Sequence, residues 1–235
     1  MKNRSMMMFV AGVALIALST AAEADLPVLL YEDFDDGDFD GWAVQHPYSP
    51  SGSSLTPDIV SSPEGYSIRG VGSGYGSLEA AYLVRPVAMN NIAALSIEMR
   101  AKSGPSWPNM AGVWLLNDTQ WYRPLDYGES SKAAALNVNL GAGDQYPGWH
   151  YIGNRAYEWH TFGWNRDSSG WWSLRIDGQM EAENFWQDTT LSSFNKIALE
   201  VTRNQSEIEW VRVTPEPATL TLLAAGLLFL RRRRK

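Results

Sequence analysis

The chain of 235 residues contains no cysteine. A thiol nucleophile and a thiolate zinc site are therefore excluded, and no disulfide can support the fold. Stability must come from burial of a core, with or without a metal ion. Histidine is also scarce. The chain has three histidines, His46, His150 and His160, and they are scattered along the sequence. A lone histidine is more often structural than catalytic, so histidine chemistry receives little support.

Positive charge is scarce in the middle of the chain. Seven of the 19 basic residues lie within residues 1–24 and 214–235, whereas two of the 26 acidic residues do. The part between them carries 12 basic and 24 acidic residues. Such an acidic surface repels phosphate backbones, so we expect no nucleic-acid partner. Its length of about 190 residues is that of one ordinary domain with a sizeable core.

A long hydrophobic run is missing from both ends. At the N-terminus, Lys2 and Arg4 precede an apolar stretch from Met6 to Leu18. The segment Ala22-Glu23-Ala24 then supplies the small residues, Ala22 and Ala24, that signal peptidase requires. We therefore predict a cleaved signal peptide over residues 1–24 and a mature chain that begins at Asp25.

The C-terminus has three parts: Pro215-Glu216-Pro217, an apolar segment from Ala218 to Leu230, and five cations from Arg231 to Lys235. This order resembles the PEP-CTERM sorting tail, which here covers residues 214–235. The resemblance implies recognition and cleavage at Pro215, Glu216 and Pro217 by an exosortase of the inner membrane, in Gram-negative bacteria that make exopolysaccharide. The apolar segment would span only about 20 Å of a core of about 30 Å, so we expect a transient transmembrane helix and not a lasting anchor.

Residues 25–213 are predicted to form one all-β domain. Leu95, Ile97 and Met99 alternate with polar residues, the period of a half-buried strand. Asp177-Gly178 indicates a tight hairpin turn. Ten strands are expected, over residues 28–34, 67–71, 78–84, 94–101, 112–116, 134–140, 159–164, 171–176, 196–201 and 208–213, with loops at 47–57, 103–109 and 141–148.

Such spacing is typical of an antiparallel two-sheet sandwich, and we predict a jelly roll. The opening segment Tyr31 to Trp42 and the closing segment Ile208 to Val213 resemble the first and last strands of jelly-roll carbohydrate-binding and concanavalin A-like lectin or glucanase domains. The resemblance implies an exported domain that binds or acts on glycans.

The acidic opening segment suggests a structural calcium ion. Residues 36–41 fit the D-x-D-x-D-G half of a calcium loop, but Pro47 stands where an EF-hand needs glutamate. In the jelly-roll family such an ion ties the first strand to the last, which implies Asp35 and Glu209 as ligands. Asp33, Asp36 and Asp38 could supplement them. The alternative is a solvated acidic turn.

Aromatic residues are abundant, with 11 tryptophans. Exposed aromatic clusters tend to mark binding surfaces, and sugar rings stack on aromatic faces while amides and carboxylates bond their hydroxyl groups. The segment from Asp144 to Asn154 supplies both kinds of group. The predicted glycan-binding residues are Trp107, Gln145, Tyr146, Trp149, His150, Tyr151 and Asn154.

No catalytic residue is predicted. The E-x-D-x-x-E pattern of retaining glucanases is missing, and so is the G-x-S-x-G elbow of serine hydrolases. We therefore expect a glycan-binding protein associated with an exopolysaccharide matrix at the cell surface or outside the cell. The alternatives are a glycoside hydrolase or polysaccharide lyase on the same fold, and a purely structural matrix protein.

Overall fold

The computed structural model describes residues 28–46, 55–71, 80–104, 109–129, 132–150, 157–202 and 206–217. Within these ranges the chain is built from fifteen strands. They are β1 (Leu30–Glu32), β2 (Ala43–Val44), β3 (Thr56–Ser61), β4 (Tyr66–Val71), β5 (Ala80–Met89), β6 (Ile92–Lys102), β7 (Met110–Asn117), β8 (Gln120–Glu129), β9 (Lys132–Asn139), β10 (Asp144–His150), β11 (His160–Arg166), β12 (Trp171–Ile176), β13 (Gln179–Gln187), β14 (Phe194–Thr202) and β15 (Glu207–Pro217).

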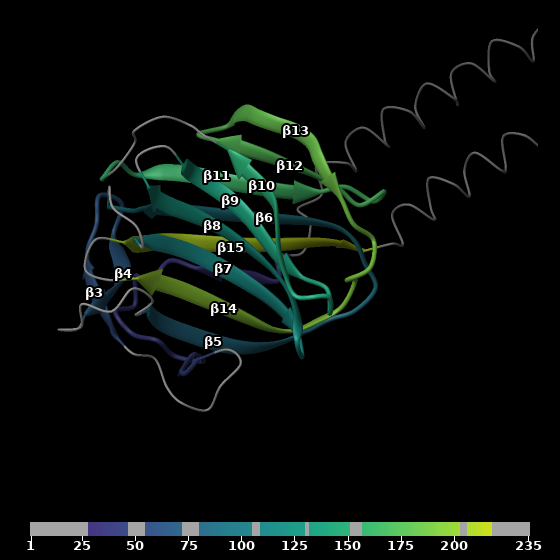
Figure 1. Cartoon of the computed structure of the whole chain (residues 1–235). Coiled ribbons are helices and arrows are strands. Elements are labelled where there is room, and N and C mark those ends of the chain that lie inside the picture. The colour runs from purple at the N-terminus through teal and green to yellow at the C-terminus, as the bar shows by residue number, and fades with distance from the viewer. Residues whose placement is uncertain are drawn as a thin grey trace, which may run out of the picture.

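The strands form two antiparallel sheets (Figure 1). Sheet 1 has the order β13-β12-β11-β6-β15-β4-β3, and β1 also pairs with β15. Sheet 2 has the order β10-β9-β8-β7-β14-β5-β2. β6 and β15 are neighbours in sheet 1 but lie far apart in the chain, and the same holds for β7 and β14 in sheet 2. The chain therefore passes from one sheet to the other several times, as in a jelly roll. The all-β, antiparallel jelly-roll prediction is confirmed.

The core lies between the two sheets. In β6, Leu95, Ile97 and Met99 are almost fully buried, whereas Ser96 and Glu98 are partly exposed. Ile97 and Met99 join one hydrophobic cluster that contains side chains from both sheets. The alternation in the sequence therefore marks the inner and outer faces of this strand correctly.

All ten predicted strands are present, with ends shifted by a few residues. Asp177 and Gly178 form the two-residue turn between β12 and β13, with φ angles of 51° and 79°. Two positive φ angles are the geometry of a type I′ hairpin turn, which suits aspartate followed by glycine.

The sequence prediction misses five strands, β2, β3, β8, β10 and β13. The predicted loop at 141–148 is wrong because β10 begins at Asp144 and pairs with β9. A register shift between Gln145 and Gly148 accommodates Pro147, a residue that normally interrupts a ladder. The predicted loop at 47–57 overlaps β3, which begins at Thr56.

Several predictions concern residues outside the described ranges. These are the signal peptide over residues 1–24 with Ala22 and Ala24, the apolar segment over 218–230, and the basic residues 231–235. In the described part of the chain, no helix is long and apolar enough to cross a membrane. At the C-terminal end, β15 extends beyond the predicted domain boundary at 213 and includes the backbone of Pro215, Glu216 and Pro217.

Candidate functional site

The outer face of sheet 2 carries a group of large aromatic side chains. We call it the aromatic face, and it consists of Tyr82, Trp114, Trp121, Tyr127 and Trp149. They belong to two hydrophobic clusters that are separate from the main core. A sheet whose outer face is solvent-exposed normally carries polar residues there. Tyr82, Trp114 and Trp121 are buried, at 8%, 6% and 5% exposure, whereas Tyr127 and Trp149 are partly exposed and could contact a ligand.

Strand alternation places these rings on the outside. In β7, Val113 and Leu115 belong to the main core, so Trp114 between them points to the opposite face. Likewise, Tyr122 of β8 lies in the core and its neighbour Trp121 lies on the aromatic face. Trp149 of β10 pairs with Ala135 of β9, and both belong to an outer cluster.

A buried ion pair lies within this face. The Arg123 guanidinium donates from Nε to Glu200 Oε2 over 2.9 Å and from Nη2 to Oε1 over 2.8 Å. The Trp114 indole N–H also donates to Oε2, over 2.8 Å, and the Tyr82 hydroxyl donates to Oε1, over 3.3 Å. Glu200 is 2% exposed. The bidentate geometry and the two further donors compensate the burial of this carboxylate.

Arg123 and Glu200 also contact the aromatic rings around them. The Arg123 guanidinium carbon lies 4.5 Å from the centroid of the Trp114 ring, within the range of a cation–π contact. Trp114 and Trp121 meet edge to face with centroids 4.8 Å apart. Burial, together with the Glu200 carboxylate, raises the pKa of Tyr82, so its hydroxyl stays protonated as a donor.

The aromatic side chains of β10 are more exposed than those of β5 and β7. Trp114 is 6% exposed, Trp149 is partly buried, and Tyr146 at the start of β10 is 55% exposed. Tyr127 packs against Trp149 edge to face with centroids 4.9 Å apart, and Tyr146 lies 6.2 Å from Trp149 at an angle of 31°. The aromatic face is therefore most accessible at its β10 end.

The predicted glycan-binding residues fall into three groups. Tyr146 and Trp149 lie together at the accessible end, and Gln145 beside them is exposed. His150 pairs with Ala134 of the core and packs its ring against Phe185 of β13 at 4.7 Å, so it faces away from Trp149. Burial lowers the pKa of this histidine. The remaining three, Trp107, Tyr151 and Asn154, lie outside the described residues.

Sequence reasoning misses the ion pair. Glu200 and Arg123 are 77 positions apart in the chain, so their pairing depends on the crossover that places β14 beside β7. The sequence signal available was an acid inside the apolar run of residues 197–201, since a charge at such a position needs a partner.

The predicted calcium ligands approach a common turn at residues 62–65. A Cβ atom added to Gly65 would clash with the Asp35 carboxylate, so Asp35 lies directly against this turn. Glu209 is 2% exposed and accepts a hydrogen bond of 2.8 Å from the Glu64 backbone N–H. Arg100 bonds the other oxygen of Glu209 and also pairs with the Glu64 side chain.

These contacts limit the fit of a calcium ion. Arg100 supplies to Glu209 the positive charge that calcium would supply, while Asp33, Asp36 and Asp38 each use one oxygen to bond the backbone N–H two residues later. Over the ranges that the structure describes, no three acidic or histidine side chains gather as a metal site. Calcium binding stays a prediction, and substitution of Asp35 is the test of it.

We expect added calcium to raise the melting temperature of the domain if Asp35 and its neighbours bind it. A ligand of the native state stabilises that state by about 2.7 kcal/mol at a hundredfold excess over its dissociation constant. The measurement is a thermal melt with calcium and with a chelator, for the natural chain and for Asp35→Asn. Asp58→Asn, an exposed acid on β3, is the matched control. Identical melts in calcium and chelator would show that the acidic segment is only solvated.

Residues 213–235 match the family model described as the PEP-CTERM protein-sorting motif. The chain therefore carries this motif, as the order of Pro215-Glu216-Pro217, apolar segment and basic residues predicts. The motif indicates exosortase-dependent export and sorting to the cell surface. No curated protein matches the chain significantly.

Solved structures of similar fold include glycan-active proteins. β-Agarase A from Zobellia galactanivorans superposes with a TM-score of 0.57 at 14% identity, over 82% of this chain and 92% of that one. A Bacillus licheniformis β-glucanase gives 0.57 at 12%, over 80% and 98%. Domain 4 of an extracellular arabinanase from Geobacillus stearothermophilus, solved with arabinotriose, gives 0.57 at 11%, over 81% and 93%. At these identities the likeness concerns the fold.

Proposed function

We propose that this protein is an exported, non-catalytic glycan-binding protein that associates with an exopolysaccharide matrix at the cell surface. The sorting motif supports the location. The aromatic face supports the ligand class, and it is the observation on which the proposal chiefly depends. In this proposal signal peptidase and an exosortase process the chain, which is held at the inner membrane only until the tail is removed.

The geometry of the aromatic face suits an extended sugar chain. Tyr127, Trp149 and Tyr146 follow one another from β8 to the start of β10, with neighbouring centroids 4.9 and 6.2 Å apart. Aromatic rings offer large apolar faces at little cost in conformational entropy, which suits the apolar C–H faces of sugar rings. The exposed Gln145 adds an amide that can bond hydroxyl groups.

Glu200 supports binding over catalysis at this face. A glycoside hydrolase uses two carboxyl groups, one as an acid and one as a base or nucleophile. Both oxygens of Glu200 are instead held by Arg123, Trp114 and Tyr82. A carboxylate in a bidentate ion pair with two further donors is a poor nucleophile and a poor proton donor, so the pair acts as a rigid support for the rings around it.

We expect Trp149→Ala to weaken binding of polysaccharide about thirtyfold while the domain stays folded. Truncating an aromatic anchor in a binding site often costs about 2 kcal/mol or more, and each 1.4 kcal/mol is a factor of ten in affinity. The measurement is affinity electrophoresis in gels that contain polysaccharide from an exopolysaccharide-producing bacterium, paired with a thermal melt.

Tyr66→Ala is the control, because Tyr66 is an exposed aromatic of sheet 1 at 42% exposure. Its retardation in the gel should equal that of the natural chain. If Trp149→Ala melts far below the natural protein yet binds with unchanged affinity, Trp149 is a packing residue and the aromatic face is not the binding surface.

A further inference from the structure

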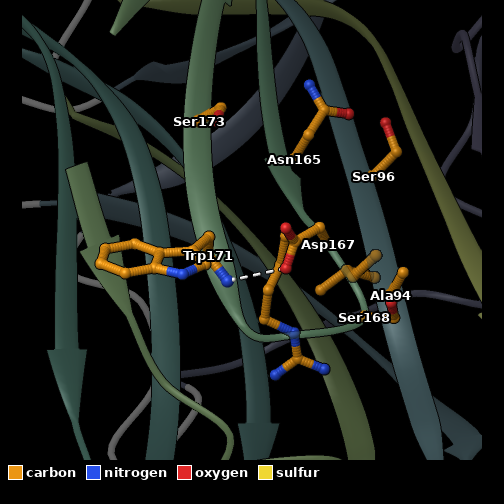
Figure 2. A pocket seen from close by; sticks show the side chains of 9 residues that line it. Ala94, Ser96, Asn165, Asp167, Ser168, Trp171 and Ser173 are labelled. Carbon is orange, nitrogen blue, oxygen red and sulfur yellow. Dashed lines mark hydrogen bonds between the residues drawn. The ribbon is translucent and has the colours of Figure 1, made fainter. Parts of the chain in front are cut away.

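A second site-like feature lies on the opposite side of the molecule, on the outer face of sheet 1. A pocket of about 320 Å³ opens between the β11–β12 hairpin and the start of β6. This volume is at the small end of the range for small-molecule sites, about 300 to 1,000 Å³. The lining includes Ser96, Asn165, Asp167, Trp171 and Ser173 (Figure 2).

Strand register places three of these polar side chains in one row. Asn165 of β11 pairs with Ser173 of β12 on one side and with Ser96 of β6 on the other. Figure 2 shows the three side chains next to one another across these strands. The Asn165 amide makes only a long contact of 3.5 Å to the Gly163 carbonyl among the described residues. The row therefore offers amide and hydroxyl groups for a ligand.

Asp167 and Trp171 complete the pocket from the hairpin. Asp167 Oδ1 accepts hydrogen bonds from the backbone N–H groups of Ser169, over 2.8 Å, and Trp171, over 2.9 Å. These two bonds fix the turn, and because both use Oδ1, Oδ2 can accept from a ligand. Trp171 also lines the pocket, and its indole extends along the sheet surface to the side away from Asn165 and Ser96 (Figure 2). It is 36% exposed, whereas the adjacent Trp172 is buried in the core.

The charge of the pocket limits its ligands. Arg166 also lines it, but its guanidinium donates to the Tyr122 hydroxyl and to the carbonyl oxygens of Leu191 and Ile92 in the interior. Asp167 is thus the charged group with an uncommitted oxygen. A carboxylate in this position repels an acidic sugar and accepts hydrogen bonds from a neutral one.

We propose that this pocket is a second glycan-binding site, selective for neutral over uronic acid sugars. Asn165, Ser96 and Asp167 bond the hydroxyl groups of one sugar ring, and the indole of Trp171, which extends beside the pocket, contacts the apolar face of the next ring in the chain. This inference rests on the proposed function, because it assigns the same class of ligand to another surface. Two sites on opposite sheets would let one molecule hold two glycan chains.

The test is isothermal titration calorimetry with the protein as it is isolated from the cells that export it. The ligands are the neutral hexasaccharides of agarose, β-1,3-glucan and arabinan, and a hexauronate from alginate. Trp171→Ala should weaken binding of the neutral ligand about thirtyfold and Asn165→Ala about tenfold. Tyr66→Ala, on the same sheet outside the pocket, should bind as the natural chain does. Asp167→Asn keeps Oδ1 for the turn and should strengthen binding of the hexauronate.

The outcomes separate this proposal from the proposed function. If Trp171→Ala binds normally while Trp149→Ala loses binding, the pocket is not a glycan site and the aromatic face remains one. If Trp171→Ala weakens binding and Trp149→Ala does not, the pocket is the glycan site. If the natural protein binds none of the three neutral hexasaccharides, the pocket assignment is rejected. The proposed function is then tested separately, by affinity electrophoresis in the gel that contains polysaccharide.

Discussion

Replacing Glu200 by alanine is expected to destabilise the domain by about 3 to 5 kcal/mol, because it leaves the Arg123 guanidinium buried without its counter-charge. The Arg123 side chain is 15% exposed, so water cannot replace the carboxylate fully. Trp114 and Tyr82 lose the same acceptor. For a domain of this size the melting temperature should fall by on the order of 10 °C.

The matched control is Glu98→Ala. Glu98 pairs with Arg212 on the outer face of sheet 1 at 3.3 Å, but the two side chains are 38% and 46% exposed. An exposed pair of this kind is worth about 0 to 1 kcal/mol. Chemical denaturation of both variants gives the comparison. If Glu98→Ala and Glu200→Ala lower the free energy of unfolding equally, the buried pair stabilises the domain no more than the exposed pair does.

Asp126→Asn is expected to stabilise the domain at pH 8 relative to the natural chain, by on the order of 4 kcal/mol. Asp126 is 4% exposed, and burial raises the pKa of its carboxyl from 3.8 to about 7, against a smaller opposite effect of a hydrogen bond from Ser103. The folded state therefore keeps a proton on Asp126 that the unfolded state has already lost. Ionisation of this group at high pH works against folding.

The pH dependence follows from the two pKa values. Below pH 3.8 Asp126 is protonated in both states and makes no difference to stability. As pH rises toward 7 the unfolded state binds fewer protons than the folded state, so stability falls, and above 7 the loss is complete. Denaturant unfolding of both chains between pH 4 and 8 measures this. A difference in unfolding free energy that stays constant over this range would contradict the assignment.

Sequence patterns locate strands whose residues alternate cleanly, and proline inside a strand hides two of the others. β6 and β12 are predicted because apolar and polar residues alternate along them. β8 contains Pro124, and β10 contains Pro147 followed by Gly148, so both look like loops. β8 is held by β7 and β9 on its two sides, and this tertiary pairing overrides its poor local propensity.

The candidate sites are predictable only in part, for a similar reason. Tyr146 and Trp149 stand out as aromatic residues in a polar segment, and the structure brings them together. Their neighbour His150 looks equivalent in the sequence but lies on the other side of β10, because adjacent residues of a strand point to opposite faces. The row of Ser96, Asn165 and Ser173 depends on the register of three strands, which one sequence does not reveal.

The end of β15 ties the sorting motif to the fold. Pro215 and Glu216 pair with Leu95 and Ala94 of β6, whereas β1 accompanies β15 only as far as Val213. Beyond Val213 the strand pairs, among the residues that the structure describes, with β6 alone, and prolines 215 and 217 cannot donate to the ladder. A backbone segment cannot be paired in a sheet and extended in a protease cleft at the same moment. Cleavage at this motif, which the proposed function requires, would therefore need the pairs of Pro215 and Glu216 with β6 to open first.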